Sequence, residues 1–208
     1  MIPRGPFSCI LADPPWRFDH YSDKGEVKSA QRHYACASLD DIKALPVRES
    51  AARDAYLFLW ATGPMIAQAL ELIPAWGFKY SALAFVWVKT NKRAPALFWD
   101  ERAIFKGMGY TTRQNAEFVL LGRRGRPERL SKSISQIIVA PRREHSRKPD
   151  ELFDRVEAFC AGPRLELFAR ETRPGWASFG NETTKFDAPA IAPALLSGGD
   201  YDTRDGAA

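Results

Sequence analysis

Short hydrophobic runs alternate with polar, turn-forming segments along the chain. Runs that are rich in leucine, aromatic and β-branched side chains are typical of buried strands. Such runs lie at 7–12, 55–60, 80–88, 117–121, 136–139 and 164–169. Patterns that predict helices lie between them, at 39–45, 65–76 and 149–161. Strands that alternate with helices predict an α/β layered domain with a mostly parallel sheet.

Residues at the ends of the predicted helices support this interpretation. Ser38 is a preferred N-cap residue for the helix at 39–45, and two aspartates follow in its first turn. Gly77 suits the end of the second helix, and Pro149 suits the first position of the third. Sheets of this class bind ligands at the carboxyl ends of their strands. Residues that directly follow a predicted strand are therefore the first candidates for a site.

The sequence Ala-Asp-Pro-Pro-Trp at 12–16 follows the first hydrophobic run directly. Two successive prolines fix φ and remove two backbone donors, so neither a helix nor a strand ladder can continue. We expect a stiff loop with a carboxylate, Asp13, at its base and a large flat ring, Trp16, at its tip. An Asp-Pro turn after a strand is also common as a purely structural feature, although the full four-residue motif is more specific.

The same loop offers a specific kind of chemistry. The Asp13 carboxylate and the Pro14 carbonyl together provide two acceptors for an –NH2 group. Trp16, or another nearby aromatic side chain, can pack on a heterocycle. This combination fits the exocyclic amine of a nucleobase that is held out of its stack. Acceptors that hold the amine protons leave the nitrogen lone pair aimed at an electrophile, and such orientation can supply much of a rate enhancement.

Positive charge is concentrated in the middle of the chain. The net charge is +5, but residues 89–148 hold fifteen Lys or Arg against five Asp or Glu, a net of +10 that leaves −5 elsewhere. This segment favours a polyanion such as nucleic acid, although a solvated loop with surplus arginine gives the same count. Basic and aromatic residues interleave in it, which suits a flipped or single-stranded substrate. The candidate substrate contacts are Lys89, Asn91, Lys92, Arg93, Tyr110 and Arg113; phosphate contacts are expected from Arg123, Arg124, Arg126 and Arg129.

The remaining composition narrows the class of protein. The 208 residues, 45% of them hydrophobic, suit one domain with a full core. No apolar stretch approaches the ~20 residues of a membrane span, and no signal-peptide pattern opens the chain. The three cysteines are far apart and include no C-x-x-C pair, so we expect neither a metal site nor a disulfide framework. A cytoplasmic location is the natural expectation.

Several stretches together resemble the adenine-N(6) methyltransferase family, which includes the catalytic subunit of the eukaryotic mRNA methyltransferase and smaller bacterial and phage DNA adenine methyltransferases. They are ADPPW at 12–16, YLFLWATG at 56–63, FVWVKTN at 85–91, EHSRKPDELFDRVE at 144–157, LELFARETRPGW at 165–176 and GNE at 180–182. The resemblance implies a Rossmann-like methyltransferase sheet with helices on both faces and a circularly permuted motif order. It also implies S-adenosylmethionine as the methyl donor.

The resemblance assigns roles to individual residues. Its catalytic motif corresponds to Asp13, Pro14, Pro15 and Trp16. Lys148, near the start of a predicted helix, pairs with the donor's methionine carboxylate, although alone it would read as an ordinary exposed lysine. Phe168 packs on the donor's adenine, and Arg170, on the same face of the strand, reaches the ribose. The implied donor contacts are Asp13, Lys148, Phe168, Arg170, Asn181 and Glu182; His33 and Tyr34 are candidates for a substrate gate.

We therefore expect a methyltransferase domain over residues 1–187, with substrate-recognition loops at 89–148, and a disordered tail over 188–208. The mRNA enzyme has zinc-finger modules and an acidic donor contact before its catalytic strand. We expect neither in this chain; the acidic contact is not expected because the first strand is predicted to begin at residue 7. The adenine end of the donor pocket is therefore left without an assigned acid.

The expected reaction is direct methyl transfer to the N6 amine of adenine in DNA. RNA is the alternative substrate, because the chemistry is the same. A non-catalytic nucleic-acid-binding subunit is a rival class, against which the intact motif and Lys148 argue. A methyltransferase for a small-molecule or protein amine is a third class, which the basic segment disfavours. The sequence leaves open whether the chain acts alone, as a homodimer or with a partner subunit.

Overall fold

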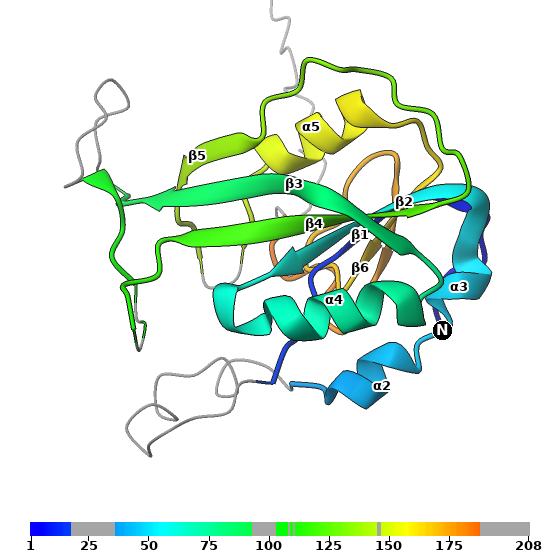
Figure 1. The fold of residues 1–208 in the computed structure, drawn as a ribbon, viewed down its shortest axis with the longest axis horizontal. Coiled ribbons are helices and arrows are strands. Elements are labelled where there is room, and N and C mark those ends of the chain that lie inside the picture. Colours follow the sequence, from blue (N-terminus) through cyan, green and yellow to red (C-terminus); the bar gives the residue numbers. More distant parts are fainter. Residues whose placement is uncertain (18–35, 93–102, 108, 110, 145–146, 188–208) are drawn as a thin grey trace, which may run out of the picture.

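The structure, a computed structural model, describes residues 1–17, 36–92, 103–107, 109, 111–144 and 147–187. Within these residues the chain forms a seven-stranded sheet in the order β5-β3-β4-β2-β1-β6-β7 (Figure 1). The strands are β1 (Phe7–Ala12), β2 (Ala51–Ala61), β3 (Lys79–Thr90), β4 (Ala116–Arg124), β5 (Ile137–Pro141), β6 (Arg164–Leu167) and β7 (Trp176–Phe179).

Strand direction decides which residues share an edge of the sheet. β1 pairs in parallel with β2 and β6, β3 with β5, and β6 with β7. β4 runs antiparallel to both of its neighbours, β2 and β3. The prediction of a mostly parallel sheet is confirmed, with β4 as the reversed strand. The start of β4 therefore lies with the carboxyl ends of the other strands, and its end lies at the opposite edge.

Helices cover both faces of the sheet (Figure 1). They are α2 (Leu39–Lys43), α3 (Val47–Ser50), the 3-10 turn η2 (Gly63–Met65), α4 (Ile66–Ala75) and α5 (Glu151–Phe159). In β1, Ile10 belongs to the core cluster on the α4 side, and its neighbour Leu11 belongs to the cluster on the α5 side. Because both faces of β1 are buried, its sequence is a continuous hydrophobic run rather than an alternating one.

The predicted signals are confirmed at the start of α2 and at the end of α4, but not at the start of α5. The Ser38 hydroxyl accepts a hydrogen bond of 3.1 Å from the Asp41 N–H, which confirms the N-cap of α2. Gly77 has φ of +83° just beyond α4, as expected for a glycine at a helix end. The last helix is shorter than predicted: Asp150 is the N-cap, so Pro149 precedes α5 instead of taking its first position, and α5 ends at Phe159. No helix among the described residues is long and apolar enough to cross a membrane.

β7 is the strand that the sequence pattern did not predict. It has four residues, and only Trp176 among them is buried. β7 pairs with β6 alone, so it is an edge strand with one neighbour. A short, half-exposed segment ending beside a glycine shows neither an apolar run nor strict alternation. The expected disordered tail at 188–208 lies outside the described residues.

Candidate active site

The Asp-Pro-Pro-Trp loop is fixed by its own backbone. Asp13 directly follows β1, and its N–H donates to the carbonyl of Leu167 at the end of β6 over 3.4 Å. The Trp16 N–H donates to the Pro14 carbonyl over 2.8 Å, and the Ala37 N–H donates to the Pro15 carbonyl over 3.1 Å. A carbonyl oxygen has two lone pairs, so the Pro14 oxygen keeps acceptor capacity. The loop is therefore the rigid structure that two prolines predict.

Trp16 does not lie where the sequence suggested. Its side chain is 4% exposed and packs in the core cluster on the α4 side. Its indole N–H donates to the carbonyl of Trp60 over 3.2 Å. The prediction that this ring lies exposed at the tip of the loop is wrong. Burying a large indole and giving its N–H an acceptor is more favourable in free energy than leaving the ring in solvent. Trp16 anchors the loop to the end of β2, and the acceptor groups before it stay in place.

Four charged side chains lie in a row along the carboxyl edge of the sheet. We call them the charge chain; they are Lys89, Glu117, Lys148 and Asp13. Lys148 Nζ lies 2.6 Å from Asp13 Oδ2 and 3.5 Å from Glu117 Oε2. Glu117 also accepts a short hydrogen bond from Lys89 near the end of β3. Lys148 precedes α5, and Glu117 stands at the start of β4, so the reversed strand brings this carboxylate to the site. Sequence reasoning missed Glu117; its only signal is an acid opening a hydrophobic strand.

The two carboxyl groups are shifted in opposite directions. Burial raises the pKa of Asp13, the Lys148 ammonium opposes this effect, and the Glu117 carboxylate adds to it. Burial also acts to raise the pKa of Glu117, but Lys148 and Lys89 outweigh it and hold the pKa below its ordinary value. A pair of carboxylates separated by one lysine thus has a stronger and a weaker acid. Asp13 is the weaker acid, and therefore the better proton acceptor.

A cavity of about 570 Å³ opens beside the loop. This volume is in the range of small-molecule sites. The predicted donor contacts Asp13, Phe168, Arg170, Asn181 and Glu182 all line it, and Pro14, Pro15 and Phe179 line it too. Asp41 of α2 also lines the cavity, so an acidic side chain is present although the sequence had left that position unassigned. The structure therefore brings together residues from the ends of β1, β6 and β7.

Close backbone packing shapes the wall of this cavity. β6 ends at Leu167, and Phe168 has φ of +63°, the left-handed conformation. The expected alternation of Phe168 and Arg170 out of a strand is therefore wrong, and Phe168 reaches the cavity through a turn. The Ala169 N–H donates to the Phe179 carbonyl over 3.0 Å, and a Cβ on Gly180 would lie 2.5 Å from the Ala169 oxygen. Only glycine allows this approach.

Arg170 and Glu182 hold each other in the wall of the cavity. Arg170 Nη2 donates to Glu182 Oε2 over 2.7 Å, and the two side chains are 15% and 36% exposed. The guanidinium also lies over the Phe186 ring, 5.2 Å from its centroid. Both charged groups therefore keep a fixed position beside Asn181.

A second, smaller hollow shares Asp13, Phe168 and Arg170 with this cavity. Its wall includes Lys148, Glu166 and three arginines, Arg147, Arg170 and Arg173. Glu166 Oε2 is buried and has no hydrogen-bond partner among the described residues. Burial raises the pKa of Glu166 to about 8, although the nearby Arg173 opposes the shift. An unsatisfied buried acceptor beside a hollow is a group that a donor on a ligand can satisfy.

Glu166 makes stability depend on pH. Its folded-state pKa of about 8 lies above the unfolded value of about 4.3, so only the folded chain keeps this proton between them. The contribution of Glu166 to stability is therefore largest at low pH, and it falls by up to about 1.4 kcal/mol per pH unit across this window. We expect urea denaturation at pH 5.5 and 7.5 to show a smaller pH dependence in Glu166→Gln. The exposed control Glu49→Gln keeps the wild-type difference, and equal differences in both variants contradict the assignment.

The predicted substrate contacts have mixed outcomes. Lys89 is part of the charge chain, and Lys92 and Arg113 are exposed residues of the segments beyond β3 and before β4. The Asn91 N–H donates to the carbonyl of Ala103 over 2.9 Å, which joins these segments. His33, Tyr34, Arg93 and Tyr110 lie outside the described residues.

The arginines of the predicted phosphate-binding group lie away from this site. Arg123 and Arg124 end β4, and Arg126 and Arg129 follow it. Because β4 is antiparallel to β2 and β3, its end lies at the edge opposite Asp13. Residues 89–148 therefore do not form a single set of loops at the catalytic edge, because they include β4 and β5; their role in substrate recognition stays a prediction. The basic segment divides between two edges of the sheet.

The sheet order and the cavity at the ends of β1 and β6 define the class of protein. A cavity that combines aromatic walls with acidic, amide and guanidinium groups, next to an Asp-Pro-Pro-Trp loop, is that of an S-adenosylmethionine-dependent methyltransferase. The chain belongs to the MT-A70 family, whose model matches residues 7–182. Methyltransferases of this family use S-adenosylmethionine as methyl donor.

Curated relatives show how far the similarity extends. The chain is 31% identical over 199 residues to the type II methyltransferase M.MunI of Mycoplasma sp, covering 87% of this chain and 79% of that protein. It is 34% identical over 182 residues to an N(6)-adenosine-methyltransferase MT-A70-like protein of Arabidopsis thaliana, covering 86% and 24%. It is 30% identical over 185 residues to the human N(6)-adenosine-methyltransferase catalytic subunit METTL3, covering 86% and 28%. The chain spans about a quarter of these two eukaryotic proteins.

Proposed function

We propose that the protein methylates the N6 amine of adenine in DNA by direct displacement, with S-adenosylmethionine as donor. The position of Asp13 carries this proposal. Asp13 lines both the 570 Å³ cavity and the smaller hollow that contains Lys148. A carboxylate at this junction lies beside the donor, and together with the adjacent Pro14 carbonyl it can hold the amine that receives the methyl group.

The cavity has the chemistry that the donor requires. Phe168 and Phe179 provide apolar surface for a purine, and Asn181 and Glu182 offer hydrogen-bonding groups for ribose hydroxyls. Lys148 and the cluster of arginines around the smaller hollow suit a carboxylate, and Glu166 Oε2 suits an ammonium group. When bound, S-adenosylmethionine supplies an electrophilic methyl group on a positively charged sulfur.

The protein's own part in the reaction is to hold the amine. Asp13 and the Pro14 carbonyl accept the two amine protons, which directs the nitrogen lone pair toward the cavity. The nitrogen–carbon bond forms as the carbon–sulfur bond breaks, and the nitrogen then loses one proton. The raised pKa of Asp13 makes its carboxylate a suitable acceptor for that proton. No covalent intermediate with the enzyme is needed.

The choice of DNA rests on the relatives. The alignment with the bacterial type II methyltransferase covers most of both chains, whereas the eukaryotic adenosine methyltransferases match over about a quarter of their length. RNA is the second candidate, because the relatives also include N(6)-adenosine-methyltransferases.

The test uses purified full-length protein, radiolabelled donor and three substrates: double-stranded DNA, single-stranded DNA and RNA. We expect labelled N6-methyldeoxyadenosine after digestion of the DNA to nucleosides. If label appears only in N6-methyladenosine from RNA, the choice of DNA as substrate is wrong, but the proposed methyl transfer to the N6 amine still stands. Donor binding without transfer to any of the three overturns the proposal that this chain by itself methylates nucleic acid.

A further inference from the structure

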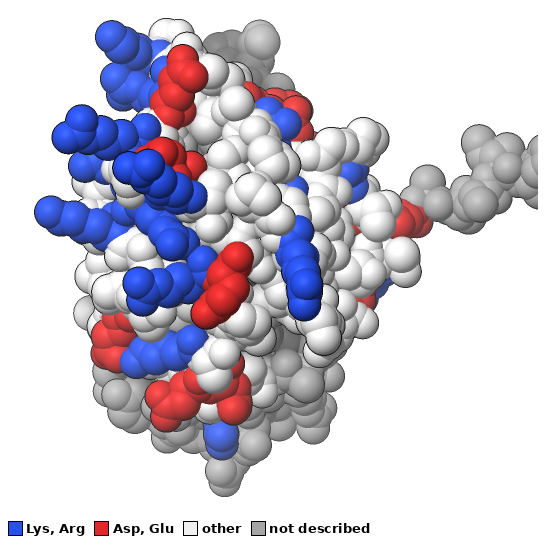
Figure 2. Space-filling model, turned by 90° about the vertical axis from the view of Figure 1, so that its right-hand side faces the viewer, with Lys and Arg blue, Asp and Glu red and all other residues white. Residues whose placement is uncertain are grey.

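The edge of the sheet opposite Asp13 carries dense positive charge. Basic residues gather there from four separate segments: the chain before β1, α3 with the start of β2, the start of β3, and the end of β4 with its following loop. Figure 2, which views this edge, shows Lys and Arg predominating along one side, with acidic side chains between them. We call this set the basic rim; it comprises Arg4, Arg48, Arg53, Lys79, Arg123, Arg124, Arg126 and Arg129.

Strand register holds the middle of the basic rim together. Arg123 lies opposite Lys79 of β3 and opposite Tyr56 of β2. Neighbouring strands are about 4.8 Å apart, so the two basic side chains start from adjacent strands. Arg124 Nη1 donates to the carbonyl of Arg48 over 2.8 Å, which ties α3 to the end of β4. The rim is therefore part of the sheet, and not a set of independent loops.

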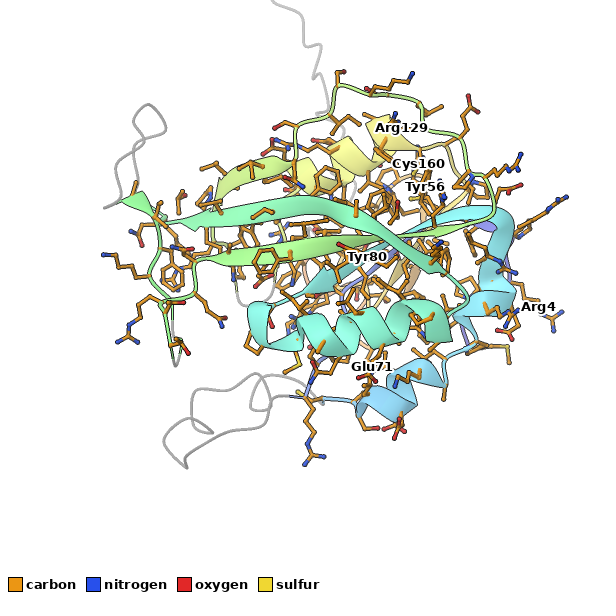
Figure 3. All side chains as sticks on the ribbon, viewed as in Figure 1. Arg4, Tyr56, Glu71, Tyr80, Arg129 and Cys160 are labelled. Carbon is orange, nitrogen blue, oxygen red and sulfur yellow. The ribbon has the colours of Figure 1, made fainter. Side chains whose placement is uncertain are left out.

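A tight turn places Arg126 beside the start of β2. The Arg126 N–H donates to Asp54 Oδ1 over 2.6 Å. Gly125 before it has φ of +62°, and a Cβ there would lie 2.1 Å from the same oxygen and 2.6 Å from the Arg53 carbonyl. Only glycine permits this approach, and the approach brings Arg126 next to Arg53. Figure 3 shows Arg4 beside α3, and Arg129 near Tyr56 toward the same end of the sheet.

The rim's charge is not neutralised within the protein. Its segments hold eight basic residues against three acidic ones, Glu49, Asp54 and Glu128. All eight except Arg124 are exposed. In the part of the chain that the structure describes, none of the eight makes an ion pair with a carboxylate. Like charges held side by side repel each other, and an anion bound from outside removes that cost.

The basic rim is too far from the catalytic loop to serve the target base. Glu117 of the charge chain and Arg124 of the rim are seven residues apart on β4. At about 3.4 Å per residue they are separated by roughly 24 Å. This distance corresponds to about seven base pairs of duplex, at about 3.4 Å per base pair. A nucleic acid bound at the rim is therefore a different stretch of backbone from the one that holds the reacting adenine.

We propose that the basic rim is a second nucleic-acid site, which binds the phosphate backbone outside the target base. Arginine, whose planar fork matches phosphate geometry, makes up seven of the eight residues. Contacts of this kind add affinity without reading sequence. The choice of nucleic acid as the polyanion rests on the proposed function of the catalytic edge. The rim keeps a long substrate associated with the protein while the target base is sought.

The test separates the rim from the methyl-transfer chemistry. A 40-base-pair dG·dC duplex contains no adenine, so its binding does not depend on the catalytic loop. The variant Arg53→Gln/Arg123→Gln/Arg126→Gln removes three exposed charges, and its matched control replaces the same residues with lysine. Lys43→Gln, which breaks the ion pair between Lys43 of α2 and Glu71 of α4, is a control away from the rim. Fluorescence anisotropy at several salt concentrations gives the affinity and its salt dependence.

We expect the glutamine variant to bind the duplex about 10- to 100-fold more weakly, and to lower the slope of log K against log salt by roughly 3. The lysine variant and Lys43→Gln keep the wild-type slope. Unchanged binding of S-adenosylmethionine shows that the variant is folded. A wild-type slope in the glutamine variant overturns the proposal. Preferential binding of vesicles rich in phosphatidylserine, lost in the same variant, overturns the choice of nucleic acid.

The proposal and the proposed function fail in different ways. Wild-type protein that binds the dG·dC duplex through the rim but methylates no adenine contradicts the function alone. Protein that methylates DNA, and whose glutamine variant binds the duplex as wild type does, contradicts the rim alone. An RNA duplex of the same length tests whether the rim prefers the phosphate backbone of DNA or of RNA. Equal affinity for the two duplexes shows that the rim binds the phosphate backbone of either nucleic acid.

Discussion

Replacing Asp13 with asparagine is expected to lower the rate of methyl transfer by about 10²- to 10³-fold. The amide keeps the shape of the side chain and one acceptor oxygen, but it removes the charge and cannot accept a proton. Loss of one preorganised electrostatic contact at a reacting centre costs about 2.7–4 kcal/mol of transition-state stabilisation. The loop itself stays in place, because its backbone bonds and the buried Trp16 ring hold it.

Single-turnover assays with labelled donor give the rate, and calorimetry gives donor affinity. Asp154→Asn makes the same chemical change at an exposed position of α5, and we expect its activity to stay within twofold of wild type. A rate in Asp13→Asn within threefold of the control contradicts the role assigned to the carboxylate. If the rate of Asp13→Asn falls only by the same factor as its donor affinity, Asp13 binds the donor and does not hold the amine.

The residues that sequence predicted best are those that follow strands. Asp13 was predicted because a hydrophobic run ends in a motif that no regular structure can continue. Asn181 and Glu182 were placed through a family resemblance, and the structure brings both to the cavity with Asp13. Prolines and turn residues that end a hydrophobic run are reliable signals, because they restrict the backbone locally and few tertiary contacts can override that restriction.

The residues that sequence missed depend on tertiary direction. Nothing in the pattern of β4 states that it runs against its neighbours, because a hydrophobic strand reads alike in either direction. Yet that direction brings Glu117 to the site and carries Arg123 to the opposite edge. Trp16 is a different case: a ring next to a catalytic loop suggests stacking, and only the packed structure shows that it is buried against β2.

Substitutions of Lys148 distinguish its contribution to stability from its contribution to donor binding. Its ammonium lies between Asp13 and Glu117, and 5.1 Å from the centroid of the Trp60 ring. The three charged side chains are only 13–25% exposed. Lys148→Met keeps most of the volume but leaves two carboxylates beside each other without the cation. We expect about 2–3 kcal/mol less stability at pH 7.5, because an uncompensated buried charge is costly.

The pH dependence of that loss identifies its cause. Without Lys148, the pKa values of both carboxyl groups rise, since the cation that lowers them is removed. A folded-state pKa raised above the unfolded value favours the folded chain at low pH, and the benefit is lost as pH rises. The stability of Lys148→Met should therefore approach that of wild type at pH 5.5. An equal deficit at both pH values contradicts the electrostatic explanation and points to lost packing.

A second substitution then isolates the role of Lys148 toward the donor. Lys148→Met/Glu117→Gln removes one of the two carboxylates, so we expect most of the stability at pH 7.5 to return. Donor affinity and methyl transfer should remain at least 10²-fold below wild type if Lys148 binds the donor's carboxylate. Lys148→Arg keeps the charge and should retain more donor affinity than either variant. Recovery of donor affinity in the double variant would instead show that Lys148 serves the site only by balancing Asp13 and Glu117.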